Sequence, residues 1–123
     1  VNLEEAVRWA EYAISGAFIG EKNFRTLSTK AGLLAKLGKQ SSADSLMNLA
    51  IALPSAAVMD LHTYARTLQA QGRKQDALKI FEINAQRNPK EWVTQWGLAR
   101  GYSAVGEYSK ALKAAEKALT LGP

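Results

Sequence analysis

The chain has no cysteine among its 123 residues, only three prolines and a single histidine. The absence of cysteine excludes disulfide bonds, cysteine-ligated zinc, iron–sulfur clusters and thiol nucleophiles. Long apolar runs are missing too. The longest candidate, residues 13–20, is interrupted by Gly16 and falls short of the roughly 20 residues that cross a bilayer. We therefore predict no membrane insertion.

The motifs of catalysis and cofactor binding are also missing. Neither GxGxxG nor GxxxxGK[ST] occurs, so no phosphate-binding loop is predicted. A metal or catalytic role for His62 needs a nearby second histidine or carboxylate, but Ala65 and Arg66 stand one turn later. We expect no enzyme, no cofactor, no metal and no catalytic residue, and interpret His62 as a groove or packing residue.

Charge is unevenly distributed along the chain. The net charge is +5, but residues 1–21 hold one base and four acids, whereas residues 22–123 hold the other 15 bases and seven acids. A basic body favours acidic partners. Because no run of five or six like charges occurs, a basic nucleic-acid-binding tail is not predicted.

The dominant pattern is a repeat of 34 residues. Glycine recurs at Gly38, Gly72 and Gly106, each followed five positions later by alanine. Glycine commonly stands just past a helix end, and proline breaks a helix. With prolines at the ends of the repeats, the pattern predicts two helices in each. Pro89 and Pro123 are in register with the repeat, and Pro54 lies one position out of register.

Apolar spacing and capping residues place the helices and predict no strands. Asn2 with Glu5, Asn23, and Ser41 with Asp44 stand where helix caps are needed. The expected helices are 3–15, 24–37, 42–53, 56–71, 75–88, 91–105 and 108–121.

These helices predict an all-α fold, a right-handed α-solenoid of antiparallel helix pairs. It comprises a leading half repeat (1–20) and three repeats (23–54, 56–89 and 91–123) in one domain, 1–123. We also expect the chain to be a fragment of a longer protein.

The pattern resembles the tetratricopeptide repeat, which has Gly or Ala at its eighth position, Gly before the second helix, and then Ala, a large apolar residue, Ala and Pro. The resemblance covers nearly the whole chain, with departures such as Asn84 in place of a small apolar residue. It implies a non-catalytic protein-interaction module with a concave groove. The Lys and Asn of a dedicated carboxylate clamp are absent, because Ser28 and Gly32 hold those positions.

A narrower likeness involves residues 24–31 and 97–104. These segments look like a repeat segment at the C-terminus of exported bacterial proteins that carry an upstream domain of unknown function. The likeness implies an exported or periplasmic setting and no assigned activity.

The inward positions of the first helices supply the candidate binding residues. Arg66 and Arg100 share one position, one repeat apart, and His62 and Trp96 share another. Arginine grips carboxylates with two parallel hydrogen bonds and stacks on aromatic rings. We predict a groove for an acidic or carboxylate-bearing peptide, with Trp92 in the core. The groove residues are Arg25, Ser28, His62, Arg66, Gln69, Trp96, Arg100 and Ser103.

Three other interpretations stay open. Arg66 and Arg100 could be solvated residues with local acidic partners. The chain could be a structural spacer or docking domain for an upstream domain, self-associating through exposed terminal helices. The segment 22–123, with its excess of bases, also allows a nucleic-acid-binding helical repeat, the least favoured of the three.

Overall fold

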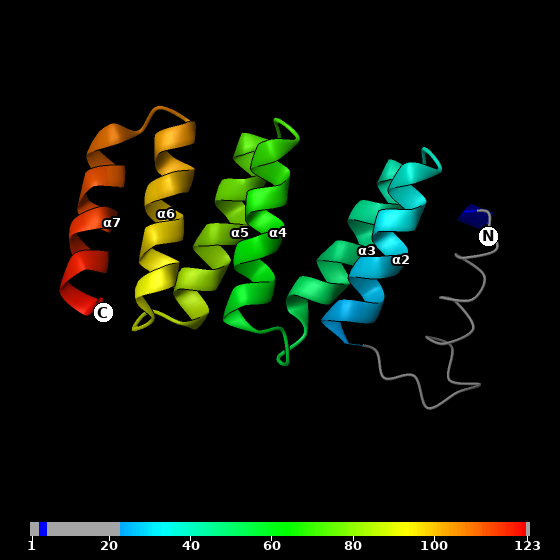
Figure 1. The fold of residues 1–123 in the computed structure, drawn as a ribbon, viewed down its shortest axis with the longest axis horizontal. Coiled ribbons are helices and arrows are strands. Elements are labelled where there is room, and N and C mark those ends of the chain that lie inside the picture. The colour runs from blue at the N-terminus through cyan, green and yellow to red at the C-terminus, as the bar shows by residue number, and fades with distance from the viewer. Residues whose placement is uncertain (1–2, 5–22, 123) are drawn as a thin grey trace. The chain divides into compact units, whose positions relative to one another are not determined.

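The computed structural model describes residues 3–4 and 23–122. Within the second range no strand occurs, and none of the described helices is long and apolar enough to cross a membrane. The helix expected over 3–15, the half repeat 1–20 and the cap at Asn2 lie outside the described residues, apart from 3–4. The helices over 23–122 are α2 (Phe24–Lys36), α3 (Gln40–Ala52), α4 (Val58–Ala70), α5 (Lys74–Arg87), α6 (Trp92–Ala104) and α7 (Tyr108–Leu121) (Figure 1).

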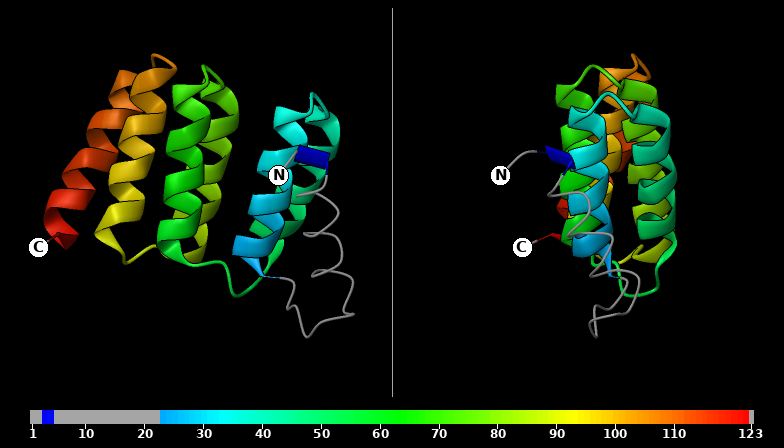
Figure 2. Two further views of the ribbon diagram at one scale, coloured as in Figure 1. Left: turned by 45° about the vertical axis from the view of Figure 1, so that its right-hand side comes forward. Right: turned by 90° about the vertical axis from the view of Figure 1, so that its right-hand side faces the viewer.

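These helices confirm the all-α prediction, and each begins and ends within about two residues of its expected bounds. The chain divides into two compact units, Val1–Ala56 and Ala57–Pro123. The first contains α2 and α3, and the second contains α4 to α7 (Figures 1 and 2). The division falls after the first residue of the second predicted repeat (56–89), and the single domain 1–123 stays a prediction.

The turn between the helices of each pair has one geometry, repeated three times. Gly38, Gly72 and Gly106 have φ angles of 81°, 81° and 86°, the left-handed region that glycine enters without steric cost. At the first turn, the N–H of Lys39 donates to the carbonyl of Leu34 at 2.9 Å. This bond and its equivalents satisfy helix-terminal carbonyls, as in a Schellman motif. The prediction that these glycines end the first helices is confirmed.

Helix starts agree with the sequence in part. The Asn23 side chain accepts from the N–H of Thr26 at 2.9 Å, and Thr26 Oγ1 accepts from the N–H of Asn23 at 3.2 Å. This reciprocal box confirms the cap predicted at Asn23. The cap predicted at Ser41 is wrong, because α3 begins at Gln40, two residues before the expected start, and its N-cap residue is Lys39. The tight turn through Gly38 carries the backbone directly into the helix, leaving no side-chain cap there.

Each unit buries the apolar faces of its own helices. In the first unit, α2 packs on α3, and small alanines let the helices approach closely. In the second unit, α4 packs on α5, and α6 packs on both α5 and α7. The buried core residues are Leu27, Ala31, Leu34, Ala43, Met47, Ala50, Ile51 and Ala56 in the first unit, and Leu61, Ala65, Leu68, Ala77, Leu78, Ile80, Phe81, Ala85, Ala114 and Ala118 in the second.

Two glycines allow α6 to lie very close to α5. A Cβ built on Gly97 would lie 2.6 Å from Phe81 Cδ1, and one on Gly101 would lie 2.9 Å from Leu78 Cδ1. Real Cβ atoms do not approach other atoms this closely. The bare backbone of α6 therefore accommodates the Phe81 ring, one of the largest fully buried side chains of the described chain.

A series of hydrogen bonds through polar side chains links three helix ends in the second unit. Asn84 Nδ2 donates to the carbonyl of Val58 at 3.0 Å, at the start of α4. Asn84 Oδ1 accepts from Asn88 Nδ2 at 3.2 Å. The Thr94 hydroxyl, at the start of α6, donates to the carbonyl of Asn88 at 2.9 Å. Buried amides need such partners, which explains why a polar residue occupies a position where the repeat favours a small apolar one.

Candidate functional site

The candidate site in the second unit is built on α4 and α6. Arg66 on α4 and Arg100 on α6 are both exposed and stand 34 residues apart in the repeat. Gln69 Nε2 donates to the backbone carbonyl of Arg100 at 3.3 Å, which ties the two helices together at this point. We call the surface formed by Arg66, Gln69, Arg100 and Ser103 the Arg face. It includes four of the eight predicted groove residues: Gln69 contacts Arg100, Arg66 precedes Gln69 by one turn of α4, and the exposed Ser103 follows Arg100 by one turn of α6.

Among the described residues, no carboxylate neutralises either guanidinium of the Arg face. Across the part of the chain that the structure describes, no Asp or Glu oxygen lies within 4.0 Å of Arg66 or Arg100. Elsewhere in the second unit, ion pairs join Arg73 to Asp76 and Lys110 to Glu107. The local acidic partners expected if the arginines were merely solvated are therefore not found among the described residues.

His62 lies beneath the Arg face rather than on it. Its side chain is only 6% exposed, and its ring centroid lies 5.6 Å from that of Phe81. Burial lowers the pKa of His62, and the positive charges of Arg66 and then Arg100 lower the pKa further. Its Nδ1 atom is buried and has no hydrogen-bond partner in the described structure. The interpretation of His62 as a packing residue fits this position.

The two tryptophans of α6 are both partly exposed. Trp96 is 43% exposed and Trp92 is 40% exposed, so the core position predicted for Trp92 was wrong. The start of α6 instead buries Thr94 and Gln95, and the Thr94 hydroxyl is held by hydrogen bonds to two carbonyls of the preceding loop.

The other two predicted groove residues lie on α2, in the first unit. Arg25 is exposed, and its carbonyl accepts from the hydroxyl of Ser28 at 3.1 Å and from that of Thr29 at 2.8 Å. The Ser28 hydroxyl is thus engaged with its own helix. The role of Arg25 and Ser28 in a groove stays a prediction.

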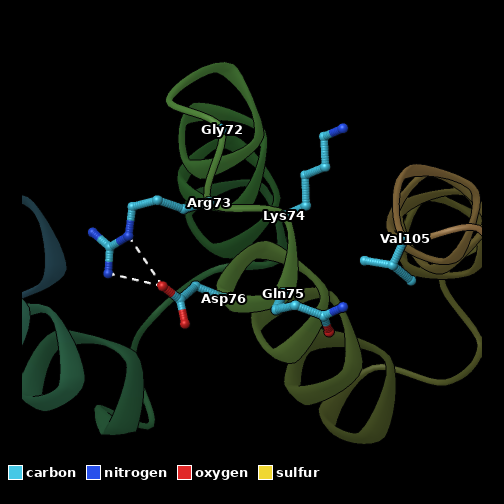
Figure 3. A pocket seen from close by; sticks show the side chains of 6 residues that line it. All are labelled: Gly72, Arg73, Lys74, Gln75, Asp76 and Val105. Carbon is cyan, nitrogen blue, oxygen red and sulfur yellow. Dashed lines mark hydrogen bonds and ion pairs between the residues drawn. The ribbon is translucent and has the colours of Figure 1, made fainter.

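A pocket of about 350 Å³ lies elsewhere in the second unit, at the turn between α4 and α5. Figure 3 shows the side chains of Arg73 and Asp76 pointing toward one another, with Val105 across from them at the end of α6. Arg73 Nε and Nη2 each lie 3.0 Å from Asp76 Oδ2. None of the predicted groove residues lines this pocket, and its arginine is engaged by a carboxylate.

Two features of the second unit were missed at the sequence level. Asn84 departs from the repeat, and Asn88 follows one turn later, a pair that could have predicted a buried amide network. The apolar side chains of α7 are the other feature. Leu112 and Leu119 are 61% and 80% exposed, and their spacing of seven residues places them on one face of the helix.

Comparison with known proteins gives the fold but no family. No protein-family model and no curated protein sequence matches this chain. Among solved structures, "MamA MSR-1 C2" is similar with a TM-score of 0.61 and 19% identity over 97% of this chain. A "MamA" crystal structure has a TM-score of 0.63 and 14% sequence identity over 97% of this chain. A point mutant of MamA has a TM-score of 0.58 and 18% sequence identity over 100% of this chain.

The chain spans 67%, 63% and 99% of these three structures, respectively. MamA is a helical-repeat protein of the tetratricopeptide type. At these identities the likeness establishes the fold alone. The chain therefore has an all-α helical-repeat fold of the tetratricopeptide type, as the 34-residue pattern predicted.

Proposed function

We propose that this chain is a non-catalytic protein-interaction module that binds an acidic or carboxylate-bearing peptide segment on the Arg face. Helical repeats of this type present an extended surface built from the first helix of each pair. In the second unit, those first helices are α4 and α6. The proposal assigns recognition of the ligand's negative charge to Arg66 and Arg100.

The observation that carries the proposal is the pair of arginines without acidic partners among the described residues. Both guanidinium groups act on the same buried imidazole, since both lower the pKa of His62. Two cations that share one neighbourhood repel each other, and a bound carboxylate would relieve that repulsion. Arginine suits this task because its planar fork can donate two parallel hydrogen bonds to one carboxylate.

The expected affinity is modest. An exposed ion pair contributes only about 0.2–1 kcal/mol, so two arginines alone would give weak binding. The Gln69 amide and the Ser103 hydroxyl add polar contacts along the same face. Electrostatic recognition of this kind also makes binding sensitive to salt.

The test uses a glutamate-rich peptide with a free C-terminal carboxylate, and the same peptide with neutral glutamine side chains and an amidated end. We expect the acidic peptide to bind the chain and the neutral one not to bind. Replacing both arginines (Arg66→Glu with Arg100→Glu) should abolish binding. The matched control replaces two exposed lysines of α7 (Lys113→Glu with Lys117→Glu), which gives the same change in net charge away from the face.

The single histidine of the chain provides a second readout. A carboxylate held between Arg66 and Arg100 should raise the pKa of His62, because it offsets the two positive charges that lower it. NMR titration of the His62 ring, with and without the acidic peptide, measures this change. If the lysine variant weakens binding as much as the arginine variant, or if the pKa of His62 does not move at saturation, the Arg face is not the binding site.

Arg25 belongs to the same proposal through its repeat position alone. A separate Arg25→Glu variant, assayed with the same two peptides, tests whether the first unit contributes to binding.

A further inference from the structure

The Arg face presents hydrogen-bond donors that no described residue engages. The guanidinium groups of Arg66 and Arg100 and the hydroxyl of Ser103 have no hydrogen-bond partner among the residues that the structure describes. A guanidinium carries five N–H donors and accepts nothing. The face therefore suits a ligand group that consists of acceptor oxygens and carries no donor of its own.

The two arginines stand on different helices but act on one neighbourhood. Arg66 lies on α4 and Arg100 on α6, and the hydrogen bond from Gln69 Nε2 to the carbonyl of Arg100 holds the two helices together at this level. Both guanidinium charges act on the same buried ring, that of His62, while α5 presents the uncharged ring of Phe81 to it. A ligand group that enters this neighbourhood is therefore within reach of both positive charges.

The charge of the ligand group follows from this pairing. Two guanidinium groups bring two positive charges, and among the described residues no carboxylate offsets either of them. A single carboxylate supplies one negative charge and leaves half of this charge unmatched. A phosphate monoester carries about −1.5 to −2 at pH 7 and has three acceptor oxygens. Arginine commonly binds phosphate through two parallel hydrogen bonds, so one such group can engage both guanidinium forks.

We propose that the Arg face binds a phosphorylated serine or threonine of a partner protein, with the phosphate monoester bridging Arg66 and Arg100. This inference rests on the proposed function and names the acidic group that the face prefers. The phosphodiester of a nucleic acid fits less well, because each of its phosphates carries a single negative charge. The ligand is therefore a phosphorylated segment rather than a nucleic acid.

The test uses three short peptides of one neutral sequence with both ends blocked. The central residue is phosphoserine in the first, glutamate in the second and serine in the third. We expect the phosphoserine peptide to bind about tenfold more tightly than the glutamate peptide, because only the phosphate can engage both arginines at once. The serine peptide should not bind. Isothermal titration calorimetry at one low salt concentration gives the Kd values.

Variants of single arginines test the bridge. Arg66→Gln and Arg100→Gln should each remove the preference for phosphoserine over glutamate, because either change leaves one guanidinium. The matched control is Lys113→Gln, which removes one positive charge from the exposed surface of α7 and should keep the preference. Arg66→Lys with Arg100→Lys retains the net charge but loses the planar forks, so it should lose most of the preference. Full preference in this last variant would overturn the bridge.

The outcomes separate this inference from the function on which it rests. Equal affinity for the phosphoserine and glutamate peptides would overturn the phosphate bridge. If the glutamate-rich peptide then still binds, and Arg66→Glu with Arg100→Glu still abolishes its binding, the acidic-peptide function stands. If no acidic or phosphorylated peptide binds, both proposals are overturned. Circular dichroism of each variant checks that helical content is retained.

Competition experiments identify the source of the phosphate. Inorganic phosphate should displace the phosphoserine peptide only at far higher concentration than the peptide itself, because it cannot reach the Gln69 and Ser103 side chains along the same face. A short single-stranded oligonucleotide, added at the same concentration of phosphate groups, should not displace the peptide. Displacement by inorganic phosphate at the peptide's own Kd would assign the site to free phosphate, and displacement by the oligonucleotide would assign it to nucleic acid. Either result would overturn the proposal.

Discussion

The backbone of Gly97 lies against the ring of Phe81, so closely that a Cβ at Gly97 would stand 2.6 Å from Phe81 Cδ1. Gly97→Ala removes a flexible residue from α6, which favours the helix by about 1 kcal/mol. Overpacking a well-packed core costs about 1–3 kcal/mol, and the buried Phe81 ring has little room to move. We expect a net loss of stability in urea denaturation, larger for Gly97→Val.

Gly32 on α2 provides the control for that prediction. It is exposed, has ordinary helical geometry, and a Cβ there would have no atom within 4 Å. Gly32→Ala should therefore stabilise its helix by about 0.5–1 kcal/mol. A stabilising Gly97→Ala would contradict the close approach of α5 and α6.

The buried amide of Asn84 should matter more to stability than its size suggests. Asn84→Ala removes the hydrogen bonds to the carbonyl of Val58 and from Asn88 Nδ2. Buried polar groups left without partners cost about 1–3 kcal/mol. We expect a loss in that range by chemical denaturation. Asn48→Ala, on the exposed side of α3, should change stability by less than about 0.5 kcal/mol.

The left-handed backbone at Gly72 predicts a graded mutational series. A residue with a Cβ costs about 1–2 kcal/mol in this conformation. Gly72→Ala should therefore lower the melting temperature. Gly72→Asn should lower it less, because asparagine tolerates the left-handed region better. Equal melting temperatures for the two variants would contradict the strained turn.

The lowered pKa of His62 makes stability depend on pH. The unfolded chain takes up a proton near pH 6.5, whereas folded His62 resists protonation because it is buried beside Arg66 and Arg100. The unfolded state then binds more protons, so the free energy of unfolding falls as pH drops below about 6.5. Above that pH the contribution is constant.

Denaturation curves collected between about pH 5 and 7 measure this slope. His62→Gln should remove the part due to His62, whatever its effect on absolute stability. An identical slope in the wild type and the variant would contradict the depressed pKa.

The fold was predictable from the sequence because its turns depend on single residues. Gly38, Gly72 and Gly106 recur at a fixed spacing, and each supplies a conformation that other residues avoid. These glycines, together with the spacing of apolar residues, predicted each of the six helices over residues 23–122. The cap at Ser41 failed because the same turn geometry continues directly into the next helix and leaves no place for a cap.

The candidate site was less predictable because exposure depends on which helices pack together. Repeat position placed Arg66 and Arg100 on one face, but it also grouped His62 with Trp96. His62 is covered by α6, whereas Trp96 is 43% exposed. Equal positions in a repeat therefore have unequal surroundings. A spacing pattern gives the direction of a side chain but not the neighbour that covers it.

The short turns at Gly38, Gly72 and Gly106 also shape how the chain can fold. The two helices of each pair are joined by a connection of only a few residues. Little conformational entropy is therefore lost when the two helices come together. Packing between sequence neighbours gives a low contact order, the topology associated with fast folding. Every helical hairpin can thus nucleate from its own local sequence, without waiting for distant segments to meet.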